Sequence, residues 1–519
     1  MTDDPVPARA GRREWLGLAV LAFPCLLIAT DFSVLHLAVP ALTAELAPSS
    51  TQLLWIVDIY GFLIAGSLIT MGTLGDRIGR RRLLLIGGSL FGLASFAAAF
   101  ASTAAMLITT RALLGVAGAT LMPSTLALIR NMFHDEHQRR IAIAVWINSF
   151  VVGGAIGPLV GGVMLEHFWW GSVFLINVPV MALLLLLGPV LLPEFRDPNA
   201  GRLDIPSAAL SLTAMLALIY GVKQVAERGV DPRAILPIVA GLAIATVFVM
   251  RQRRLADPLI DLSLFGIPTF SAAVVTQLVG ALSMGGIYLF VAQYLQLVLG
   301  LSPLQAGIAL VPSNILGIAG TMLAPFLARR YRTIYVITAG MLVSAVGIAV
   351  LTRVVSGAPL GTIVTAFIIM SIGFSLAMTL TTDLIMTAAP PERAGAASGI
   401  SETSAELGMA LGVAVLGSVG TALYRSRMEN AIPVGIPVDG AVNARATLAG
   451  ALTVSREAGG PAGENLIAAA REAFSHSLAL VSGISAAMVI ATSITTLILL
   501  RRAGAATDTS SDPQVPAAA

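Results

Sequence analysis

Long apolar runs dominate this sequence and limit its fold more than any other feature. A helix needs about 20 mostly apolar residues to cross the hydrocarbon core of a bilayer, and runs near or above that length follow one another along the chain. Hydrophobic residues make up 56% of the 519 residues and charged residues only 11%, whereas soluble domains carry roughly 25% charged residues. So few charges cannot cover a soluble surface, and we therefore expect an all-α polytopic membrane protein.

The apolar runs predict fourteen transmembrane helices. The predicted spans are 15–40, 53–73, 83–102, 104–130, 141–165, 172–193, 205–222, 234–250, 269–299, 304–328, 334–352, 359–386, 394–424 and 474–500. The first is too long for a signal-peptide core, so we expect it to be retained as a span. Of the 31 basic residues, 21 lie on the side of the spans that carries both termini. Basic loops stay in the cytoplasm, so both termini are predicted to be cytoplasmic.

Composition and residue counts exclude several function classes. A net charge of +3 gives no basis for binding nucleic acid. The single cysteine, Cys25, excludes an intrachain disulfide and a thiolate metal cluster, and the scattered histidines make a metal site improbable. The only lysine, Lys223, lies outside the GxxxxGK[ST] pattern of a phosphate-binding loop, which excludes an ATPase site of that type. We expect no catalytic residue, no cofactor and no metal.

The loop after the second predicted span carries a dense motif. The residues that form this motif are Gly72, Leu74, Asp76, Arg77, Gly79, Arg80, Arg81 and Leu84. A weaker copy follows the tenth span, from Gly320 to Arg332, about 250 residues later. Internal repeats of helical halves are typical of secondary transporters. The first loop resembles the GxLxDRxGRRxxL signature of the major facilitator superfamily.

Four further segments resemble the same superfamily. They are Asp31 with Leu37–Pro40, Trp55–Tyr60, Arg111–Ala119 and Glu402–Gly408. A fifth, Gly153–Gly162, is similar to the GxxxGPxxGG antiporter motif. Together they resemble the fourteen-helix drug:proton antiporters, specifically the quaternary-ammonium and dye exporters of the QacA and LfrA type. That resemblance implies alternating access and proton-driven export from a bacterial cytoplasmic membrane.

The resemblance also implies a division of the chain into two six-helix bundles with two helices inserted between them. The expected parts are a cytoplasmic N-terminus (1–14), an N-terminal bundle (15–193), the inserted helices with linkers (194–268), a C-terminal bundle (269–502) and a disordered tail (503–519). The external stretch 425–473 is either a plain linker or a short structured lid over an outer vestibule.

Ionisable groups inside spans are costly, at roughly 2.5–3.5 kcal/mol each on insertion scales, and are therefore candidates for function. The sequence has six: Asp31, Asp58, Arg111, Asp383, Glu402 and Glu406. At 1.5 Å per residue, Asp31 and Asp58 lie roughly 13 Å and 9 Å from the outer ends of their spans, so they could face one outer cavity. Glu402 and Glu406 share a helix face and repel each other, so the pair should hold at least one proton near neutrality. Asp383 is either a coupling residue or a solvated helix end.

These carboxylates predict antiport of protons against organic cations. Exchanging one proton for a monovalent cation moves no net charge, whereas moving one charge through 100 mV yields about 2.3 kcal/mol. Several membrane carboxylates therefore fit multi-proton coupling and divalent as well as monovalent lipophilic cations. We expect Asp31 and Glu406 to be the principal carriers, with Asp58 and Glu402 supporting them. Arg111 is expected to stabilise a carboxylate, or else to form a fixed ion pair.

Three further groups of residues complete the predicted site. The loop residues Gly72, Gly75, Asp76, Arg77, Gly79 and Arg80 are expected to form a conformational latch, with Asp76 near the start of the helix at Ala394. Gly153, Gly157, Pro158, Gly161 and Gly162 are expected to allow close helix packing. Aromatic and methionine side chains that are candidates for lining a cation cavity are Trp55, Tyr60, Met122, Trp146, Phe150, Tyr294 and Phe374.

The expected partners are small lipophilic cations, protons and the lipid bilayer, and the chain is expected to act as a monomer. The nearest alternative is a dedicated exporter of a single antibiotic or endogenous metabolite. A membrane-embedded enzyme or sensor would need a clustered His, Cys or Ser site or a soluble output domain, and a passive channel is equally disfavoured.

Overall fold

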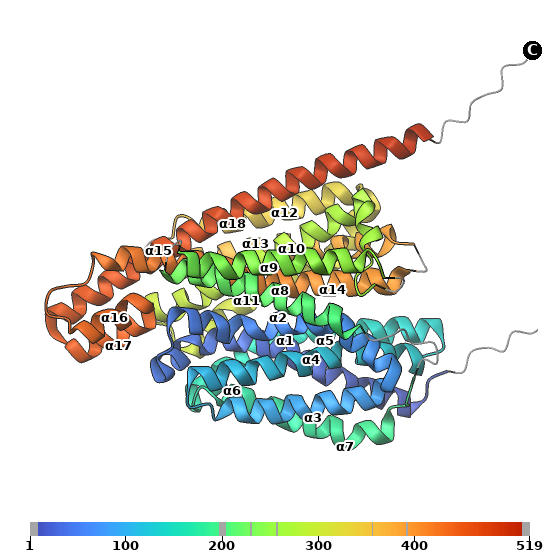
Figure 1. The fold of residues 1–519 in the computed structure, drawn as a ribbon, viewed down its shortest axis with the longest axis horizontal. Coiled ribbons are helices and arrows are strands. Elements are labelled where there is room, and N and C mark those ends of the chain that lie inside the picture. The colour runs from blue at the N-terminus through green and yellow to red at the C-terminus, as the bar shows by residue number, and fades with distance from the viewer. Residues whose placement is uncertain are drawn as a thin grey trace, which may run out of the picture.

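The chain folds into long helices that run side by side along one axis (Figure 1). The computed structural model describes residues 9–196, 204–228, 231–255, 258–354, 357–390 and 393–510. Within these ranges, thirteen helices are long and apolar enough to cross a membrane, and fourteen if one helix bent by about 40° is counted as a single span. The predicted all-α architecture is confirmed, and the fourteen predicted spans match the observed helices.

The first six passes form the N-terminal bundle. They are α1 (Arg12–Leu46), α2 (Ser50–Ile78), α3 (Arg80–Ala99), α4 (Ala104–Met132), α5 (Glu136–His167) and the joined pair α6 (Ser172–Leu175) and α7 (Asn177–Leu191). An apolar core drawn mainly from these helices holds the bundle together.

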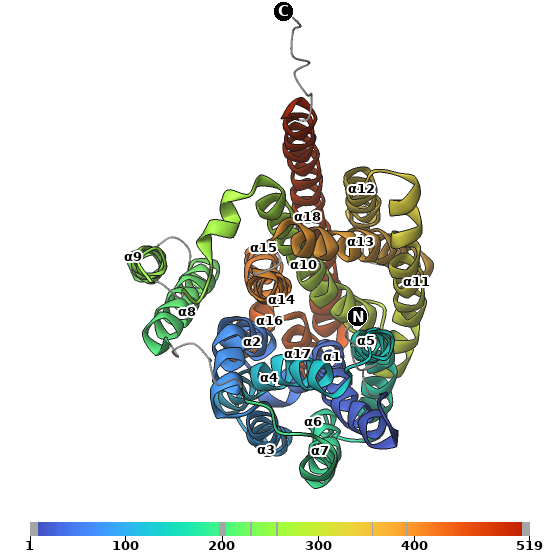
Figure 2. The ribbon, with the colours of Figure 1, turned by 90° about the vertical axis from the view of Figure 1, so that its right-hand side faces the viewer.

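Six later passes form the C-terminal bundle. They are α10 (Pro268–Gln293) with the π-helical turn η2 (Tyr294–Val298), α11 (Pro303–Arg330), α12 (Thr333–Leu351), α13 (Leu360–Ala388), α14 (Ala394–Leu411) continued through the π-helical turn η4 (Gly412–Leu416) into α15 (Gly417–Glu429), and α18 (Gly460–Ser510). A second apolar core fills this bundle. In Figure 2 the two bundles lie against each other, with α1, α2 and α5 facing the C-terminal half.

Two inserted helices connect the bundles. They are α8 (Ile205–Arg228) and α9 (Pro232–Gln252), followed by the short helix η1 (Leu262–Gly266). α8 lies against α2 and α15, whereas α9 packs on α8 at the periphery (Figure 2).

Local sequence explains where the repeated helices begin. Ser49 caps α2, because its hydroxyl accepts a hydrogen bond from the Gln52 main-chain amide. The Gln52 side-chain oxygen in turn accepts one from the Ser49 main-chain amide. Ser302 and Gln305 cap α11 in the same way. Such reciprocal caps satisfy two amide donors that have no partner within the helix. The same device therefore starts the second helix of each bundle.

The two ends of the molecule differ. We call the end where α1 begins and α18 finishes the terminus end, and the opposite end, which carries α16 (Val438–Ala446) and α17 (Leu448–Ala458), the hairpin end (Figure 1). The stretch 425–473 is therefore helical over most of its length and is not a plain linker. Ser50 at the start of α2 donates a 2.7 Å hydrogen bond to the Ala446 carbonyl, which ties this hairpin to the N-terminal bundle.

The predicted disordered tail at 503–519 needs correction. α18 continues to Ser510 in one unbroken helix, so the first part of the predicted tail is helical. Residues 511–519 lie outside the described part.

Candidate functional site

A cavity of about 640 Å³ lies between the bundles at the terminus end. Its walls come from α2, α4 and α14, together with the segments before α8 and after α9. The charged side chains on these walls are Asp76, Arg80, Arg130, Asp204, Asp261 and Glu402. The cavity thus draws on both bundles and on the inserted segment.

Two aspartates at the edges of the inserted segment are held by arginines. Asp204 accepts a 2.8 Å hydrogen bond from Arg251, and Asp261 accepts one from Arg393. Partial burial alone would raise the pKa of each carboxyl, but the hydrogen bonds from Arg251 and Ser207 on Asp204, and from Ser263 and Arg393 on Asp261, lower it below its ordinary value. Both carboxylates therefore stay ionised at neutral pH.

Glu402 is the carboxylate that α14 presents to this cavity. The side chain of Ser398, one turn earlier, hydrogen-bonds to it, and Arg130 of α4 lies within electrostatic range. Glu406, one turn further along, is partly buried and interacts electrostatically with Glu402. The structure thus places both glutamates on one face of α14, as the spacing predicts, and Glu402 directly at the cavity.

Asp31 and Arg111 form a buried ion pair between α1 and α4. The Arg111 guanidinium lies 4.5 Å from the centre of the Tyr60 ring, and its Nε donates a 3.3 Å hydrogen bond to the Ile56 carbonyl. Among the residues that the structure describes, the buried Tyr60 hydroxyl has no hydrogen-bond partner, and it interacts electrostatically with Asp31 and Glu406. Tyr60 therefore contacts the ion pair of the N-terminal bundle and is within electrostatic range of Glu406 on α14.

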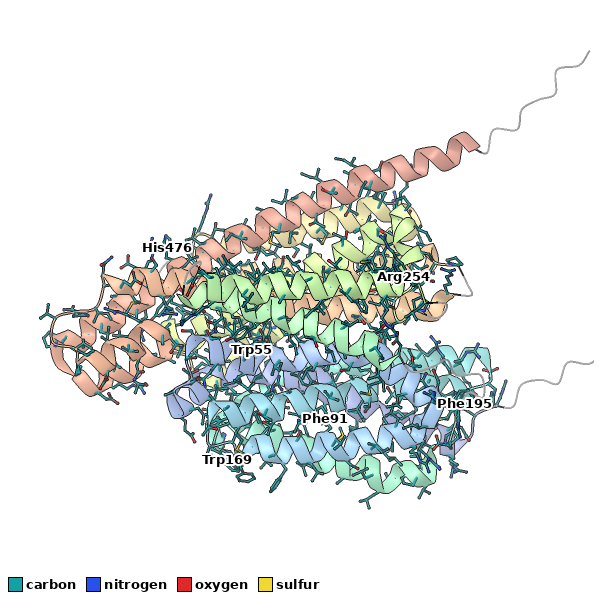
Figure 3. All side chains as sticks on the ribbon, viewed as in Figure 1. Trp55, Phe91, Trp169, Phe195, Arg254 and His476 are labelled. Atoms are coloured by element: carbon teal, nitrogen blue, oxygen red, sulfur yellow. The ribbon has the colours of Figure 1, made fainter. Side chains whose placement is uncertain are left out.

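Asp58 forms a second buried ion pair, with Lys223 of α8. The Lys223 Nζ lies 2.9 Å from Oδ1 and 2.8 Å from Oδ2 of Asp58, and 3.8 Å from the centre of the Trp55 ring (Trp55 is labelled in Figure 3). Sequence reasoning missed this lysine as a membrane charge, because the predicted span 205–222 ended one residue before it. In this structure Asp31 and Asp58 are each buried against their own cation, so the outer cavity that both could face stays a prediction.

Other predicted side chains are scattered. Asp383 is exposed near the end of α13 and is not among the cavity walls. Trp146 packs edge-on against Phe150 at 5.0 Å and donates a hydrogen bond to Thr125, in the core that also holds Met122. In the C-terminal bundle, Tyr294 is buried in η2 and Phe374 lies close to Gly280. The seven aromatic and methionine candidates therefore do not gather at the described cavity.

The predicted latch loop is folded back on its own bundle. Asp76 pairs with Arg80, one turn further along, at 2.5 Å, and its predicted contact with the start of α14 near Ala394 stays a prediction. The Arg80 amide donates to the Phe195 carbonyl, and the Arg81 amide donates to Glu194 after α7. Gly79 has a φ of +110°, which a residue with a side chain rarely adopts, and an added Cβ would lie 2.5 Å from Glu194. The loop therefore needs glycine here and is seated on the segment after α7.

The predicted antiporter motif forms two close helix contacts. A Cβ added to Gly153 would lie 2.2 Å from the Leu26 carbonyl, and one added to Gly157 would lie 2.0 Å from Ser33 Oγ, both on α1. On the other side, a Cβ added to Gly162 would lie 2.7 Å from Leu304 Cα of α11. The motif therefore packs α5 tightly both within its bundle and against the other one.

Pro158 has a visible effect on α5. Proline lacks the amide hydrogen that would bond to the carbonyl four residues earlier, here that of Gly154, and α5 bends by about 40° between Gly154 and Ile156. Asn314 of α11 donates a 3.4 Å hydrogen bond to this Gly154 carbonyl. A side chain of the other bundle thus takes the place of the missing helical bond.

Close contacts also join the bundles toward the hairpin end. Gln296 of η2 donates a 3.1 Å hydrogen bond to the Leu37 carbonyl of α1. A Cβ on Gly417 of α15 would lie 2.7 Å from the Leu54 side chain of α2, and one on Gly307 of α11 would lie 2.2 Å from the Pro158 carbonyl of α5. The bundles therefore touch closely at the hairpin end and enclose a cavity at the terminus end.

Residues 21–413 match the family model described as Major Facilitator Superfamily. The chain belongs to the major facilitator superfamily. It is therefore a transporter and not an enzyme. As a superfamily member it is a multi-pass membrane protein, in agreement with its helices.

Several curated superfamily proteins are similar to this chain over nearly its whole length. The multidrug efflux pump LfrA of Mycolicibacterium smegmatis is 41% identical over 96% of this chain and 98% of its own. The methyl viologen resistance protein SmvA of Salmonella typhimurium is 36% identical, over 92% of this chain and 97% of its own. The tetracenomycin C resistance and export protein of Streptomyces glaucescens is 32% identical, over 81% of this chain and 78% of its own.

Solved structures confirm the fold. A bacterial homologue of the human lysosomal transporter Spinster, in an inward-facing and unoccupied conformation, aligns with a TM-score of 0.67 at 18% identity, over 94% of this chain and 99% of that one. A peptide transporter in complex with sulfate aligns with a TM-score of 0.60 at 18% identity, over 94% of each chain.

Proposed function

We propose that this superfamily member is a proton-coupled multidrug exporter of lipophilic mono- and divalent organic cations. The observation that carries the proposal is Glu402 on the wall of the cavity between the bundles, with Glu406 one turn behind it. A carboxylate at such a site can hold either a proton or an organic cation. The printed names of the relatives, a multidrug efflux pump and a methyl viologen resistance protein, support this substrate class.

We also propose that the terminus end faces the cytoplasm. Arg77, Arg130, Arg251 and Arg329 are examples of the basic residues at helix ends on that side, and such residues stay in the cytoplasm. The cavity would then receive drugs from the cell interior, and closure there would accompany opening at the hairpin end.

The Asp31–Arg111 pair is proposed to take part in proton coupling. A proton on Asp31 would leave Arg111 without its counter-ion, and the guanidinium would then turn to another acceptor. Tyr60 lies against Arg111 and within electrostatic range of Glu406. These contacts support electrostatic coupling between the Asp31–Arg111 pair and Glu406 of α14.

The test uses purified protein in proteoliposomes with an imposed pH gradient. Transport of a monovalent dye and of divalent methyl viologen is measured with the membrane voltage either held or collapsed. Transport of both cations that requires the pH gradient supports the proposal. Transport that is unaffected by either gradient would refute it.

A second candidate is the export of one antibiotic or metabolite. The relative named for tetracenomycin C export favours this reading. Comparing many compounds in cells with and without the protein separates the two functions, since a dedicated exporter would change resistance to one chemical class only.

A further inference from the structure

The only lysine of the chain joins the inserted segment to the N-terminal bundle. Lys223 lies in α8 and is buried, with its Nζ 2.8 and 2.9 Å from the two carboxylate oxygens of Asp58. The face of the Trp55 ring covers the same ammonium at 3.8 Å. Trp55 and Asp58 are three residues apart and so lie on one face of α2. α2 therefore presents a ready-made acceptor for a single cation from α8.

The energetics of this contact favour permanent docking. A lysine at membrane depth is costly unless it is paired, and so is an unpaired aspartate. Separating α8 from α2 would leave both charges unpaired in hydrocarbon. An unpaired buried charge costs far more than an apolar residue at the same position. Gly66 adds a close approach, because a Cβ there would lie 2.4 Å from the Leu212 side chain of α8.

The contact of α8 with the C-terminal bundle has a different character. Ile219 packs with Ala410 of α14 and Ala414 of η4 in a small apolar cluster. Over residues 205–225, the hydrogen bonds and ion pairs of α8 go to α2, to Asp204 or to α9. Apolar faces can slide without leaving a polar group unpaired, whereas the ion pair cannot.

We propose that Lys223 is a positioning residue that fastens α8 to α2, so that the inserted helices move with the N-terminal bundle while the C-terminal bundle slides along the apolar face of α8. Asp58 is then a fixed anchor and does not exchange the transported proton. This inference rests on the proposed alternating-access function and specifies which half carries the insertion.

The first test changes the charges of the pair. Lys223→Met and Asp58→Leu should each reduce transport by roughly tenfold or more and lower the thermal unfolding temperature, because each leaves an unpaired buried charge. The double variant Asp58→Leu/Lys223→Met should regain both properties, and Lys223→Arg, which keeps the charge, should retain most activity. A double variant that is stable but still unable to couple transport to protons would overturn the inference, since Asp58 would then be a proton carrier.

The second test uses cross-links in a Cys25→Ser background, which removes the only native cysteine. Gly66→Cys/Leu212→Cys joins α8 to α2, and Ile219→Cys/Ala414→Cys joins α8 to η4 of the C-terminal bundle. The first cross-link should leave transport intact, whereas the second should stop it until a reductant is added. Inhibition by the first, or tolerance of the second, would overturn the inference.

Failure of the proposed function gives a different result. In that case the uncross-linked Cys25→Ser protein would not transport cations in response to a pH gradient. The unfolding temperatures of the single and double charge variants would still test the anchor. Equal destabilisation in the single and double variants would then refute it.

Discussion

The charged side chains within the membrane fall into two kinds. Asp31 and Asp58 each have a buried basic partner, Arg111 and Lys223. Among the described residues, no ion pair within 4 Å reaches Glu402, although Arg130 acts on it from a greater distance. Asp58 is expected to keep its charge, because protonating it would strand the buried Lys223 ammonium between two helices. Glu402 at the cavity wall is expected to exchange a proton for a substrate, and Asp31 to act on coupling through Arg111.

The glutamates of α14 should therefore carry the substrate and proton chemistry. Glu402→Gln and Glu406→Gln should each reduce pH-driven cation transport by roughly tenfold or more, because neutral amides cannot balance an organic cation in a low-dielectric site. Transport into proteoliposomes measures this. Glu429→Gln is the matched control, because Glu429 is exposed at the far end of α15. Normal pH-driven transport in a Glu402→Gln/Glu406→Gln double variant would contradict the assignment.

The Asp31–Arg111 pair should stabilise the N-terminal bundle as well as contribute to coupling. Arg111→Leu leaves Asp31 buried without its cation, and breaking such a pair costs about 3–5 kcal/mol. The thermal unfolding temperature in detergent should fall clearly. Asp31→Leu/Arg111→Leu should recover much of this loss, because no charge is then left unpaired. A double variant as unstable as Arg111→Leu would show that the pair is not the cause.

Sequence reasoning identified the carboxylates and named Arg111 as the partner of one of them, but it missed the partner of Asp58. The length of each apolar run showed that Asp31, Asp58 and the glutamates of α14 lie within spans. The partner of Asp58 lies 165 residues away on an inserted helix, and sequence spacing carries no information about packing across that distance. Lys223 was also not recognised as a membrane residue, because the apolar run predicted a span that ends at residue 222, whereas α8 continues to Arg228.

At the scale of helices, glycine positions determine how closely neighbours approach. On α5, Gly153 and Gly157 face α1, whereas Gly162 faces α11. The sequence predicted close packing from the spacing of small residues. It could not show that one helix would serve both bundles, because this depends on how the bundles meet.

Substitutions along α5 should separate tight from open positions. Gly157→Ala should destabilise the protein by about 1–3 kcal/mol, since even the added methyl group must push Ser33 and α1 aside. Gly154→Ala is a matched control in the same helix, because no atom of the described residues lies within 4 Å of its added Cβ. Thermal unfolding in detergent measures both, and equal shifts in the two variants would contradict the packing assignment.

For the whole molecule, the important contrast is between an open terminus end and a closed hairpin end. The cavity lies at the first, while α5 meets α11, and α2 meets α15, toward the second. The overall two-bundle plan was predictable from the repeated motif loops and the family resemblance. The conformation was not, because one sequence must permit both states of a transporter.

A cross-link between α5 and α11 should trap this conformation. In the Cys25→Ser background, Gly162→Cys/Leu304→Cys should stop transport on oxidation, because the hairpin end can no longer open. Binding of a fluorescent cation should persist, since the cavity at the terminus end stays accessible. Thr276→Cys/Thr496→Cys, within the C-terminal bundle, is the control, because the two threonine hydroxyls lie 2.7 Å apart and cysteine has nearly the same size. Its oxidation should leave transport unaffected. If the oxidised protein still transports cations, then α5 and α11 do not need to separate when the hairpin end opens.

The lone lysine also gives this transporter a built-in chemical reporter. An amine-reactive dye finds only two kinds of target, the amine at the start of the chain and Lys223, and peptide mapping distinguishes them. The ammonium is held between Asp58 and Trp55, where acylation requires its release. The labelling rate at Lys223 in the unmodified protein therefore records how often α8 leaves α2, without any introduced probe.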